Sequence, residues 1–263
     1  MTDFRVRYGP HALVIGGSEG LGAAWAERLA VRGLDLVLVA RRQEPLDSLA
    51  AGLRSRHGVA VETLAGDLRS PDWLDDAGGP LQERQIGMVV ANAAVAPAGP
   101  FLDSDADQLA AAVEVNCLGN LRVVRRLLPP MVERGRGGLV LMSSLAGLQG
   151  APGLATYAAT KAFLTTLGEG LWAELSPHGV DVLACVAGAV ATPGYGAATI
   201  SRAPGTLDAA KVVDSALASL GRRPRVVPGR LNRAAEVILQ RLLSRRAAVG
   251  LMALANRRVG VGT

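Results

Sequence analysis

The stretch "ALVIGGSEGLG" at residues 12–22 decides the fold. An aliphatic run passes into a turn with glycines spaced G-x-x-x-G-x-G, and a helical pattern follows. Such a turn allows a close backbone approach, so that a pyrophosphate can bind the N–H groups of the helix N-terminus. The residues expected to hold these phosphates are Gly16, Ser18, Gly20, Leu21 and Gly22. Many strand-to-helix turns are glycine-rich for steric reasons alone. Other features of the chain must therefore show whether this turn binds a dinucleotide.

Short aliphatic runs alternate with longer helical patterns along the chain. Strands are expected at 11–15, 35–40, 59–65, 86–91, 138–142, 180–186 and 225–227. Helices are expected at 20–32, 44–56, 72–84, 105–128, 155–175 and 208–220. Runs such as "DLVLVA" lack polar alternation, as is typical of strands covered on both faces. The pattern predicts an α/β fold: a doubly wound, Rossmann-like, seven-stranded parallel sheet with helices on both faces.

The composition is that of a globular protein of 263 residues, a length that fits one large domain. Only Cys117 and Cys185 are present, so we expect no disulfide framework and a reducing cytoplasm as the setting. The first strand begins too early for a signal peptide, and no apolar run is long enough to span a membrane. The three histidines have no shared acidic partner, and we predict no metal site.

The positive charge is concentrated at the C-terminus. Residues 221–263 hold ten arginines and one glutamate, whereas residues 1–220 hold 18 basic and 22 acidic residues, so nucleic-acid binding is not expected. We expect residues 1–229 to form the dinucleotide-binding and catalytic domain and residues 230–263 a basic helical extension of it.

The extension has an amphipathic pattern. Its apolar stripe of Leu231, Ala235, Ile238 and Leu242 is expected to pack on the body of the domain and leave arginines in solvent. The alternative is a basic anchor that contacts an anionic membrane as a peripheral protein, or presents an acyl-carrier partner to the site.

The end of the second strand reads Ala40, Arg41, Arg42. An acidic residue there binds the ribose 2′-hydroxyl of NAD, whereas two guanidinium groups suit the 2′-phosphate of NADP. We therefore expect NADP(H), with NAD as the less favoured cofactor. The arginines could instead be solvated surface residues, and Glu19 in the glycine turn would repel a phosphate.

In its motifs and their order, nearly the whole chain resembles the short-chain dehydrogenase/reductase family. After the glycine turn come "GDL" (66–68), "ANAA" (91–94), "VNCLGN" (115–120), "LMSSLAG" (141–147), "YAATK" (157–161) and "AGAVAT" (187–192). The resemblance implies that Asp67 and Leu68 hold the adenine, that Asn92 lies at the cofactor, and that Val190 and Thr192 hold the nicotinamide amide. The chain departs from the family pattern at Ile15, Ala91, Ala94 and Ala187, which puts the tightness of cofactor binding in doubt.

The resemblance also implies a catalytic set of Ser144, Tyr157, Lys161 and Asn116. Residues four apart share one helix face, so Lys161 can lie beneath the Tyr157 phenol and lower its pKa from about 10. Tyr157 would then donate a proton to a carbonyl oxygen that Ser144 orients, Lys161 would also hold the nicotinamide ribose, and Asn116 would fix a water chain. Ser144 could instead be a strand-end turn residue, and Asn116 a helix-kink or buried polar contact.

The resemblance further implies a homodimer or homotetramer, formed by the helices at 105–128 and 155–175. The expected activity is NADPH-dependent reduction of a ketone or aldehyde. Segment 193–207 contains no acidic residue, which favours an apolar or anionic substrate, such as an acyl or polyketide-like one. Two alternatives remain: an NAD-linked alcohol oxidation, and a catalytically silent NADP-binding sensor or partner protein.

Overall fold

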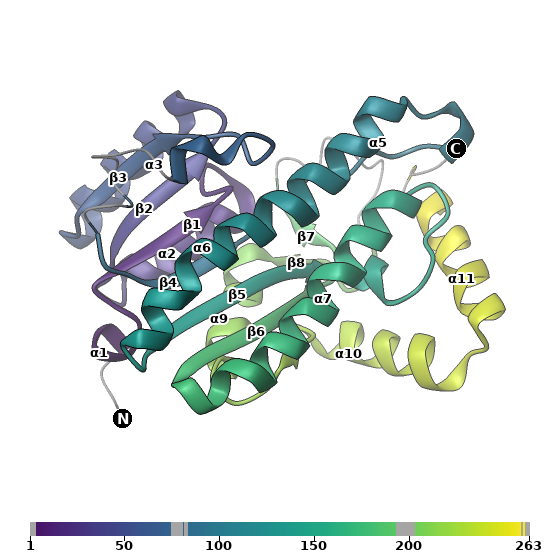
Figure 1. Cartoon of the computed structure of the whole chain (residues 1–263). Helices are drawn as coiled ribbons and strands as arrows, with labels where there is room; N and C mark the ends of the chain where they lie inside the picture. The colour runs from purple at the N-terminus through teal and green to yellow at the C-terminus, as the bar shows by residue number, and fades with distance from the viewer. Residues whose placement is uncertain (1–3, 75–80, 82–83, 193–202, 259, 261–263) are drawn as a thin grey trace.

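The computed structural model describes residues 4–74, 81, 84–192, 203–258 and 260 (Figure 1). At its centre lies a seven-stranded parallel sheet of order β3-β2-β1-β4-β5-β6-β9. The strands are β1 (His11–Ile15), β2 (Asp35–Ala40), β3 (Val61–Ala65), β4 (Ile86–Ala91), β5 (Gly137–Ser144), β6 (Val180–Ala187) and β9 (Arg225–Val226). Every residue of β4 and of β6 is buried, as expected of mostly apolar strands that are covered on both faces. The expected doubly wound α/β fold is confirmed.

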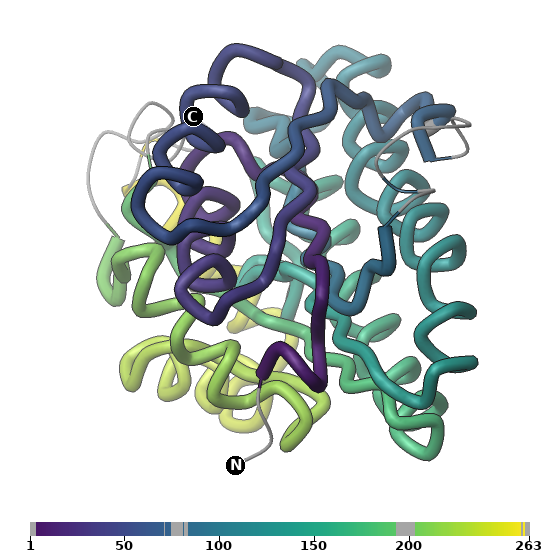
Figure 2. The backbone as a smooth tube through the Cα atoms, turned by 90° about the vertical axis from the view of Figure 1, so that its left-hand side faces the viewer, coloured from purple at the N-terminus to yellow at the C-terminus, as the bar shows by residue number. Residues whose placement is uncertain are grey.

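Helices cover both faces of the sheet. On one face lie α2 (Gly20–Ala30), α3 (Gln43–His57) and α9 (Ala209–Ser219), which share a core with β1 and β2. On the other lie α6 (Asn120–Glu133) and α7 (Ala155–Leu175), which pack on β4 and β5. In Figure 2 the teal helices lie on the opposite side of the sheet from purple α2. This arrangement brings the carboxyl ends of β1, β4 and β5 together at one edge.

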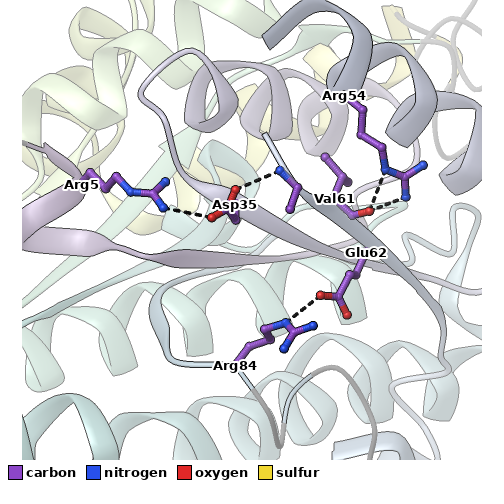
Figure 3. Close-up of polar contacts among 7 residues, drawn as sticks. Arg5, Asp35, Arg54, Val61, Glu62 and Arg84 are labelled. Carbon is purple, nitrogen blue, oxygen red and sulfur yellow. Dashed lines mark hydrogen bonds and ion pairs between the residues drawn. The ribbon is translucent and has the colours of Figure 1, made fainter. Parts of the chain in front are cut away.

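Charged side chains secure the edge strand β3. The Arg54 guanidinium of α3 donates from Nε to the Val61 carbonyl at 3.0 Å, and Arg84 Nε lies 2.7 Å from the Glu62 carboxylate (Figure 3). An unpaired strand edge invites association with other chains, and charged side chains make such pairing unfavourable.

One of the expected helices is interrupted in the structure. The helix expected at 105–128 consists of α5 (Ala106–Val113), a π-helical turn η3 (Glu114–Gly119) and α6. It continues past Pro129 and Pro130, since buried Met131 anchors the last turn against the sheet. The helix expected at 72–84 lies mostly outside the described residues; Pro71–Leu74 form a 3₁₀ turn, η1, and Leu81 is helical.

Further short elements were not expected from the sequence. They are α1 (Phe4–Tyr8), the 3₁₀ turns η2 (Phe101–Asp103), η4 (Leu145–Leu148) and η5 (Ser176–His178), and the strand pair β7 (Val190–Ala191) and β8 (Leu207–Asp208). Helix α1 is held by a distant residue, because the buried Tyr8 hydroxyl donates to the Asp181 carboxylate of β6 at 2.6 Å.

Residues 230–258, called the C-terminal arm below, comprise α10 (Arg230–Val237), a π-helical turn η6 (Ile238–Leu242) and α11 (Arg245–Arg258) (Figure 1). The expectation that Leu231, Ile238 and Leu242 pack on the body is wrong, because these side chains are 69%, 41% and 71% exposed. Asn232 and Leu239 are buried in their place. The amide of Asn232 sets this rotation of the helix, since it donates to the carbonyl oxygens of residues 205 and 228 at 3.2 and 3.0 Å.

Candidate active site

Tyr157 and Lys161 lie on one face of α7, as their spacing predicts. The Lys161 Nζ lies 5.5 Å from the centroid of the Tyr157 ring and donates to the Met142 carbonyl of β5 at 2.8 Å. Only 4% of Lys161 is exposed. The lysine is therefore held by a backbone carbonyl on one side and faces the phenol on the other.

Ser144 is the last residue of β5, and its hydroxyl is close enough to the Tyr157 phenol to lower the pKa of that group. Its Oγ also accepts from the Ala146 N–H at 3.2 Å, at the start of the turn that follows the strand. The turn contact and the tyrosine contact thus coexist. Together the two hydroxyls present adjacent polar groups at the carboxyl edge of the sheet.

Asn116 is fully buried inside the π-helical turn η3. Its Oδ1 accepts from the Val95 N–H at 2.8 Å, and its Nδ2 donates to the Val95 carbonyl at 2.8 Å and to the Thr160 Oγ1 at 2.9 Å. The side chain therefore acts as the buried polar contact that the sequence left as an alternative. Through Thr160, whose hydroxyl donates to the Tyr157 carbonyl at 2.8 Å, it is linked to the catalytic helix.

Two site residues were missed in the sequence. Thr160 lies inside the "YAATK" motif, and Ser143 precedes Ser144. The Ser143 Oγ donates to the Lys161 carbonyl at 2.7 Å and lies 2.7 Å from the Thr165 Oγ1. Both are buried hydroxyl residues, Ser143 where β5 meets α7 and Thr160 where α7 meets η3, and only their position beside the motif residues could have indicated a role.

Burial controls the pKa values in the site. It raises the pKa of Tyr157 above its ordinary value, against the smaller lowering effect of the Ser144 hydrogen bond. It also lowers the pKa of Lys161 from 10.5 to about 8. The expectation that Lys161 lowers the phenol pKa toward neutrality is therefore not met. Desolvation is the largest effect on the phenol, so Tyr157 keeps its proton at neutral pH.

The glycine turn is built as the sequence predicts. Gly16 has φ +74°, and a Cβ there would lie 2.8 Å from the Ala93 Cα, so the turn closes against the "ANAA" segment. Asn92 fastens this contact, because its Nδ2 donates to the Gly16 carbonyl at 3.1 Å. A Cβ on Gly22 would lie 1.8 Å from the Gly16 oxygen, so only glycine fits there.

The "AGAVAT" segment reaches the same turn. Thr192 follows β7, and its Cγ2 would lie 3.1 Å from a Cβ built on Gly20. Val190 of β7 is buried. Ser18, Gly20 and Leu21 lie at the start of α2, whose N-cap residue makes no side-chain capping bond within the described part of the chain. This helix N-terminus, bordered by Thr192, fits the phosphates of a dinucleotide.

Arg41 and Arg42 are exposed beside the turn. Arg42 Nη2 lies 3.3 Å from the Glu19 Oε1, so Glu19 is paired with a cation rather than standing alone near the expected phosphate. Asp67 accepts from the Arg69 side chain at 2.8 Å, and that hydrogen bond holds its pKa below its usual range. Leu68 is 5% exposed and packs in the core.

A cavity of about 330 Å³ lies beside the N-terminus of α7. Its walls include Pro97, Phe101, Leu109, Pro152 and Thr156. Thr156 and Ala155 of this lining belong to the first turn of α7, the helix that carries Tyr157. The cavity is lined mostly by apolar carbon and holds no charged side chain.

The segment expected to choose the substrate lies mostly beyond the described residues. Residues 193–202 fall outside, and from residue 203 the chain leads into β8. Among the described residues, no three His, Cys, Asp or Glu side chains are gathered to hold a metal ion. None of the helices described is long and apolar enough to cross a membrane.

Comparison with known proteins supports the motif assignment. Residues 10–201 match the family model described as short chain dehydrogenase. A very-long-chain 3-oxoacyl-CoA reductase of Podospora anserina is 38% identical over 185 residues, which cover 66% of this chain and 53% of that protein. The Bos taurus protein of that name is 36% identical, over 70% of this chain and 60% of its own length. The chain thus spans little more than half of these relatives.

A 7beta-hydroxysteroid dehydrogenase of Collinsella aerofaciens is 27% identical and matches more of the chain, 88% of this chain and 90% of that protein. A solved 7beta-hydroxysteroid dehydrogenase superposes with a TM-score of 0.89 at 25% identity, covering 95% of this chain and 99% of its own. A short-chain dehydrogenase from Sphingobium yanoikuyae in complex with NADPH has a TM-score of 0.73 at 37% identity, with 84% and 87% covered.

Proposed function

Because this chain belongs to the short-chain dehydrogenase family, we propose that it is an NADP(H)-dependent reductase of ketones or aldehydes. One observation carries the proposal: the buried Lys161 Nζ lies 5.5 Å from the centroid of the Tyr157 ring, and the Ser144 hydroxyl is near enough to affect the pKa of the phenol. A catalytically silent dinucleotide-binding protein has no need of a proton donor and a cation matched in this way.

When bound, the nicotinamide dinucleotide supplies the hydride that reduces the carbonyl carbon. Tyr157 donates the proton that the carbonyl oxygen takes up, as a general acid. Ser144 orients that oxygen through its hydroxyl, which lies beside the phenol. Because burial raises the pKa of Tyr157, the phenol stays protonated at neutral pH, and this favours reduction over alcohol oxidation.

Lys161 supplies positive charge beneath the phenol and is held there by the Met142 carbonyl. As Tyr157 loses its proton, this cation stabilises the developing phenolate. Asn116 keeps η3 in contact with α7 through Thr160, so it positions the helix that carries Tyr157.

The preference for NADP rests on Arg41 and Arg42 at the end of β2. Guanidinium groups bind phosphate through charge-assisted hydrogen bonds, and the position directly after the strand is Arg41 rather than an acidic residue that would bind a 2′-hydroxyl. The ion pair with Arg42 offsets the charge of Glu19. The complex of the Sphingobium yanoikuyae relative with NADPH agrees with this choice.

An apolar substrate with an acyl or ring skeleton fits best. The cavity at the first turn of α7 offers an apolar wall on the helix that carries Tyr157, and charged side chains are absent from its lining. The named relatives act on a very-long-chain 3-oxoacyl-CoA and on a hydroxysteroid. Both are large substrates with an oxygen function on an apolar skeleton.

A homodimer or homotetramer is the proposed assembly. Large apolar side chains are exposed on α5, η3, α6 and α7, namely Val113, Leu118, Leu121 and Phe163. Burial of such side chains between two copies would stabilise the pair by about 25 cal/mol per Å² of apolar surface.

A screen of carbonyl compounds tests the function. Long-chain 3-oxoacyl thioesters, ring ketones and small polar aldehydes would be offered with NADPH and with NADH, and cofactor oxidation followed by absorbance. We expect turnover of the apolar ketones with NADPH and much slower turnover with NADH. Tight NADPH binding without turnover of any carbonyl would instead identify a silent binding protein.

A further inference from the structure

The C-terminal arm exposes leucines where a surface helix ordinarily buries them. It holds six of the fourteen large apolar residues that are exposed in the described part of the chain. They are Leu231, Val237, Ile238, Leu242, Leu251 and Leu254. The side chains that the arm buries are Asn232, Leu239, Ala248 and Asn256. Two of these four are amides, so the arm docks largely through polar and small groups and leaves its apolar face outward, the reverse of an ordinary amphipathic surface helix.

The same surface is strongly basic. All seven arginines of the arm are exposed: Arg230, Arg233, Arg241, Arg245, Arg246, Arg257 and Arg258. Its one acidic residue is Glu236, whose carboxylate binds Arg225 of the sheet. The arm therefore presents seven exposed arginines, and its one carboxylate is engaged by Arg225.

Apolar and basic side chains alternate on this outer face. Leu231 and Ile238 are seven residues apart and Leu242 follows four later, so the three share one side of α10 and η6. Arg230 and Arg241 each directly precede one of these leucines, so they form a basic row beside the apolar one. On α11, Leu251 and Leu254 likewise lie opposite its buried side, on the face that also carries Arg246, Arg257 and Arg258.

We propose that the C-terminal arm binds the surface of an anionic lipid bilayer. In that position the leucines enter the boundary between headgroups and acyl chains, while the arginines meet lipid phosphates. A second copy of the chain is a poor occupant, because two arms facing each other would bring seven cations against seven. A protein partner would need to cover leucines that stand out from convex helices, whereas a bilayer accepts them without a matching groove.

The arm also lies next to the candidate active site. Arg245 Nη1 donates to the Leu148 carbonyl and Asn256 Nδ2 to the Pro152 carbonyl, both at 2.8 Å. Met252 packs in the small cluster that includes Tyr157. A bilayer at the arm would thus be close to the entrance of the site. Lipid binding itself does not depend on the proposed function.

Vesicle sedimentation tests the proposal. The full-length chain would be mixed with vesicles of phosphatidylcholine alone and with vesicles of equal parts phosphatidylcholine and phosphatidylglycerol, at about 0.05 and about 0.5 M NaCl. We expect binding to the anionic vesicles at low salt, at least tenfold weaker binding at high salt, and little binding to neutral vesicles. Equal binding to both vesicles, or to neither, would overturn the proposal.

Two variants and their matched controls locate the surface. Each arginine near an anionic surface contributes about fivefold in affinity, so Arg233→Gln/Arg241→Gln/Arg246→Gln should weaken binding by on the order of 100-fold. Leu231→Ser/Leu242→Ser should weaken it at least tenfold. The controls remove equal charge and equal apolar exposure elsewhere: Arg136→Gln/Arg222→Gln/Arg223→Gln and Val31→Ser/Leu102→Ser. We expect both controls to bind as the wild type does.

Because every substituted residue is exposed, the thermal midpoint and the turnover of a small soluble ketone should stay unchanged in all four variants. Binding that survives the arm substitutions would refute the arm as the lipid surface. A change in sedimentation coefficient in the leucine variant, without vesicle binding by the wild type, would assign the arm to a second copy instead. Capture of an acidic carrier protein without vesicle binding would likewise replace the bilayer by that partner.

Discussion

The Lys161 Nζ lies 5.5 Å from the centroid of the Tyr157 ring, at a place where the lysine is almost completely removed from solvent. Burial affects the two groups in opposite directions, because it raises the pKa of the phenol and lowers that of the ammonium to about 8. The phenol therefore stays protonated in the mildly alkaline range, whereas the neighbouring lysine loses its charge there. The activity and the stability of the protein should both reflect this arrangement.

Tyr157→Phe should lower kcat for a carbonyl substrate by on the order of 100- to 10,000-fold, because the transferable proton is gone while the ring still packs. NADPH binding should persist, measured by fluorescence titration. Tyr8→Phe is the matched control, since Tyr8 bonds Asp181 far along the chain and serves the fold. The control should keep its kcat and lose about 1 to 2 kcal/mol of stability. If Tyr157→Phe retains more than about a tenth of the wild-type kcat, the role of Tyr157 as the acid is wrong.

The pH profile of reduction should fall as the pH rises through about 8. Lys161 is a cation below its pKa of about 8 and neutral above it, whereas Tyr157 remains protonated across this range because its own pKa is raised. Reduction needs both the proton and the cation, so kcat/KM should be level near neutrality and then decline. A profile that stays level until the phenol ionises would show that the charge of Lys161 is not required.

The sheet could be predicted closely because most of its strands are short, mainly aliphatic runs separated by longer helical patterns. The π-helical turn η3 could not be predicted, because the sequence around Asn116 keeps the helical pattern. The wider turn is stabilised by hydrogen bonds from Asn116 to Val95 and Thr160, which are distant in the sequence. The outward orientation of the arm was hidden for a related reason. The periodicity of the arm places the leucines on one face. Which face is buried is determined by the hydrogen bonds that the Asn232 side-chain amide donates.

The site could be located in the sequence, but its electrostatics could not. The spacing of Tyr157 and Lys161 predicts their proximity, yet spacing carries no information on how deeply α7 and β5 bury them. The helper residues Ser143 and Thr160 have ordinary backbone partners and no spacing signal of their own.

Thr160→Val should show that Thr160 is a positioning residue. The substitution keeps the shape of the side chain and removes its bonds to Asn116 and to the Tyr157 carbonyl, while Asn116 still donates to Val95. We expect kcat to fall several-fold with little change in the KM for NADPH, and a stability loss of about 1 kcal/mol. Thr160→Ser restores the hydroxyl and should restore kcat. Equal loss in the serine and valine variants would show that only packing matters.

Arg41→Ala should weaken NADPH binding by about 10- to 100-fold and leave NADH binding nearly unchanged, because a charge-assisted hydrogen bond contributes roughly 1.5 to 3 kcal/mol. Titration of both cofactors into both proteins measures this. Arg136→Ala removes an exposed arginine at the start of β5, away from the cofactor region, and serves as the control. Equal weakening for NADPH and NADH would mean that Arg41 does not read the 2′-phosphate.

Lys161→Met should abolish most reduction and yet stabilise the fold. The folded pKa of about 8 lies below the unfolded value of 10.5, so the unfolded state binds more protons between these values and wild-type stability rises with pH across that window. At pH 7 the buried charge costs about 3 kcal/mol, from which about 1 kcal/mol is subtracted for the lost hydrogen bond to Met142, a net gain of about 2 kcal/mol in the variant. Urea unfolding at pH 7 and at about pH 10 should show this gain shrinking as the pH rises. Lys211→Met is the control: this other lysine of the chain is 72% exposed, and its ion pair with Asp208 is worth less than about 1 kcal/mol. If Lys161→Met unfolds at lower urea than the wild type at pH 7, burial of the charge is not the dominant cost at this position.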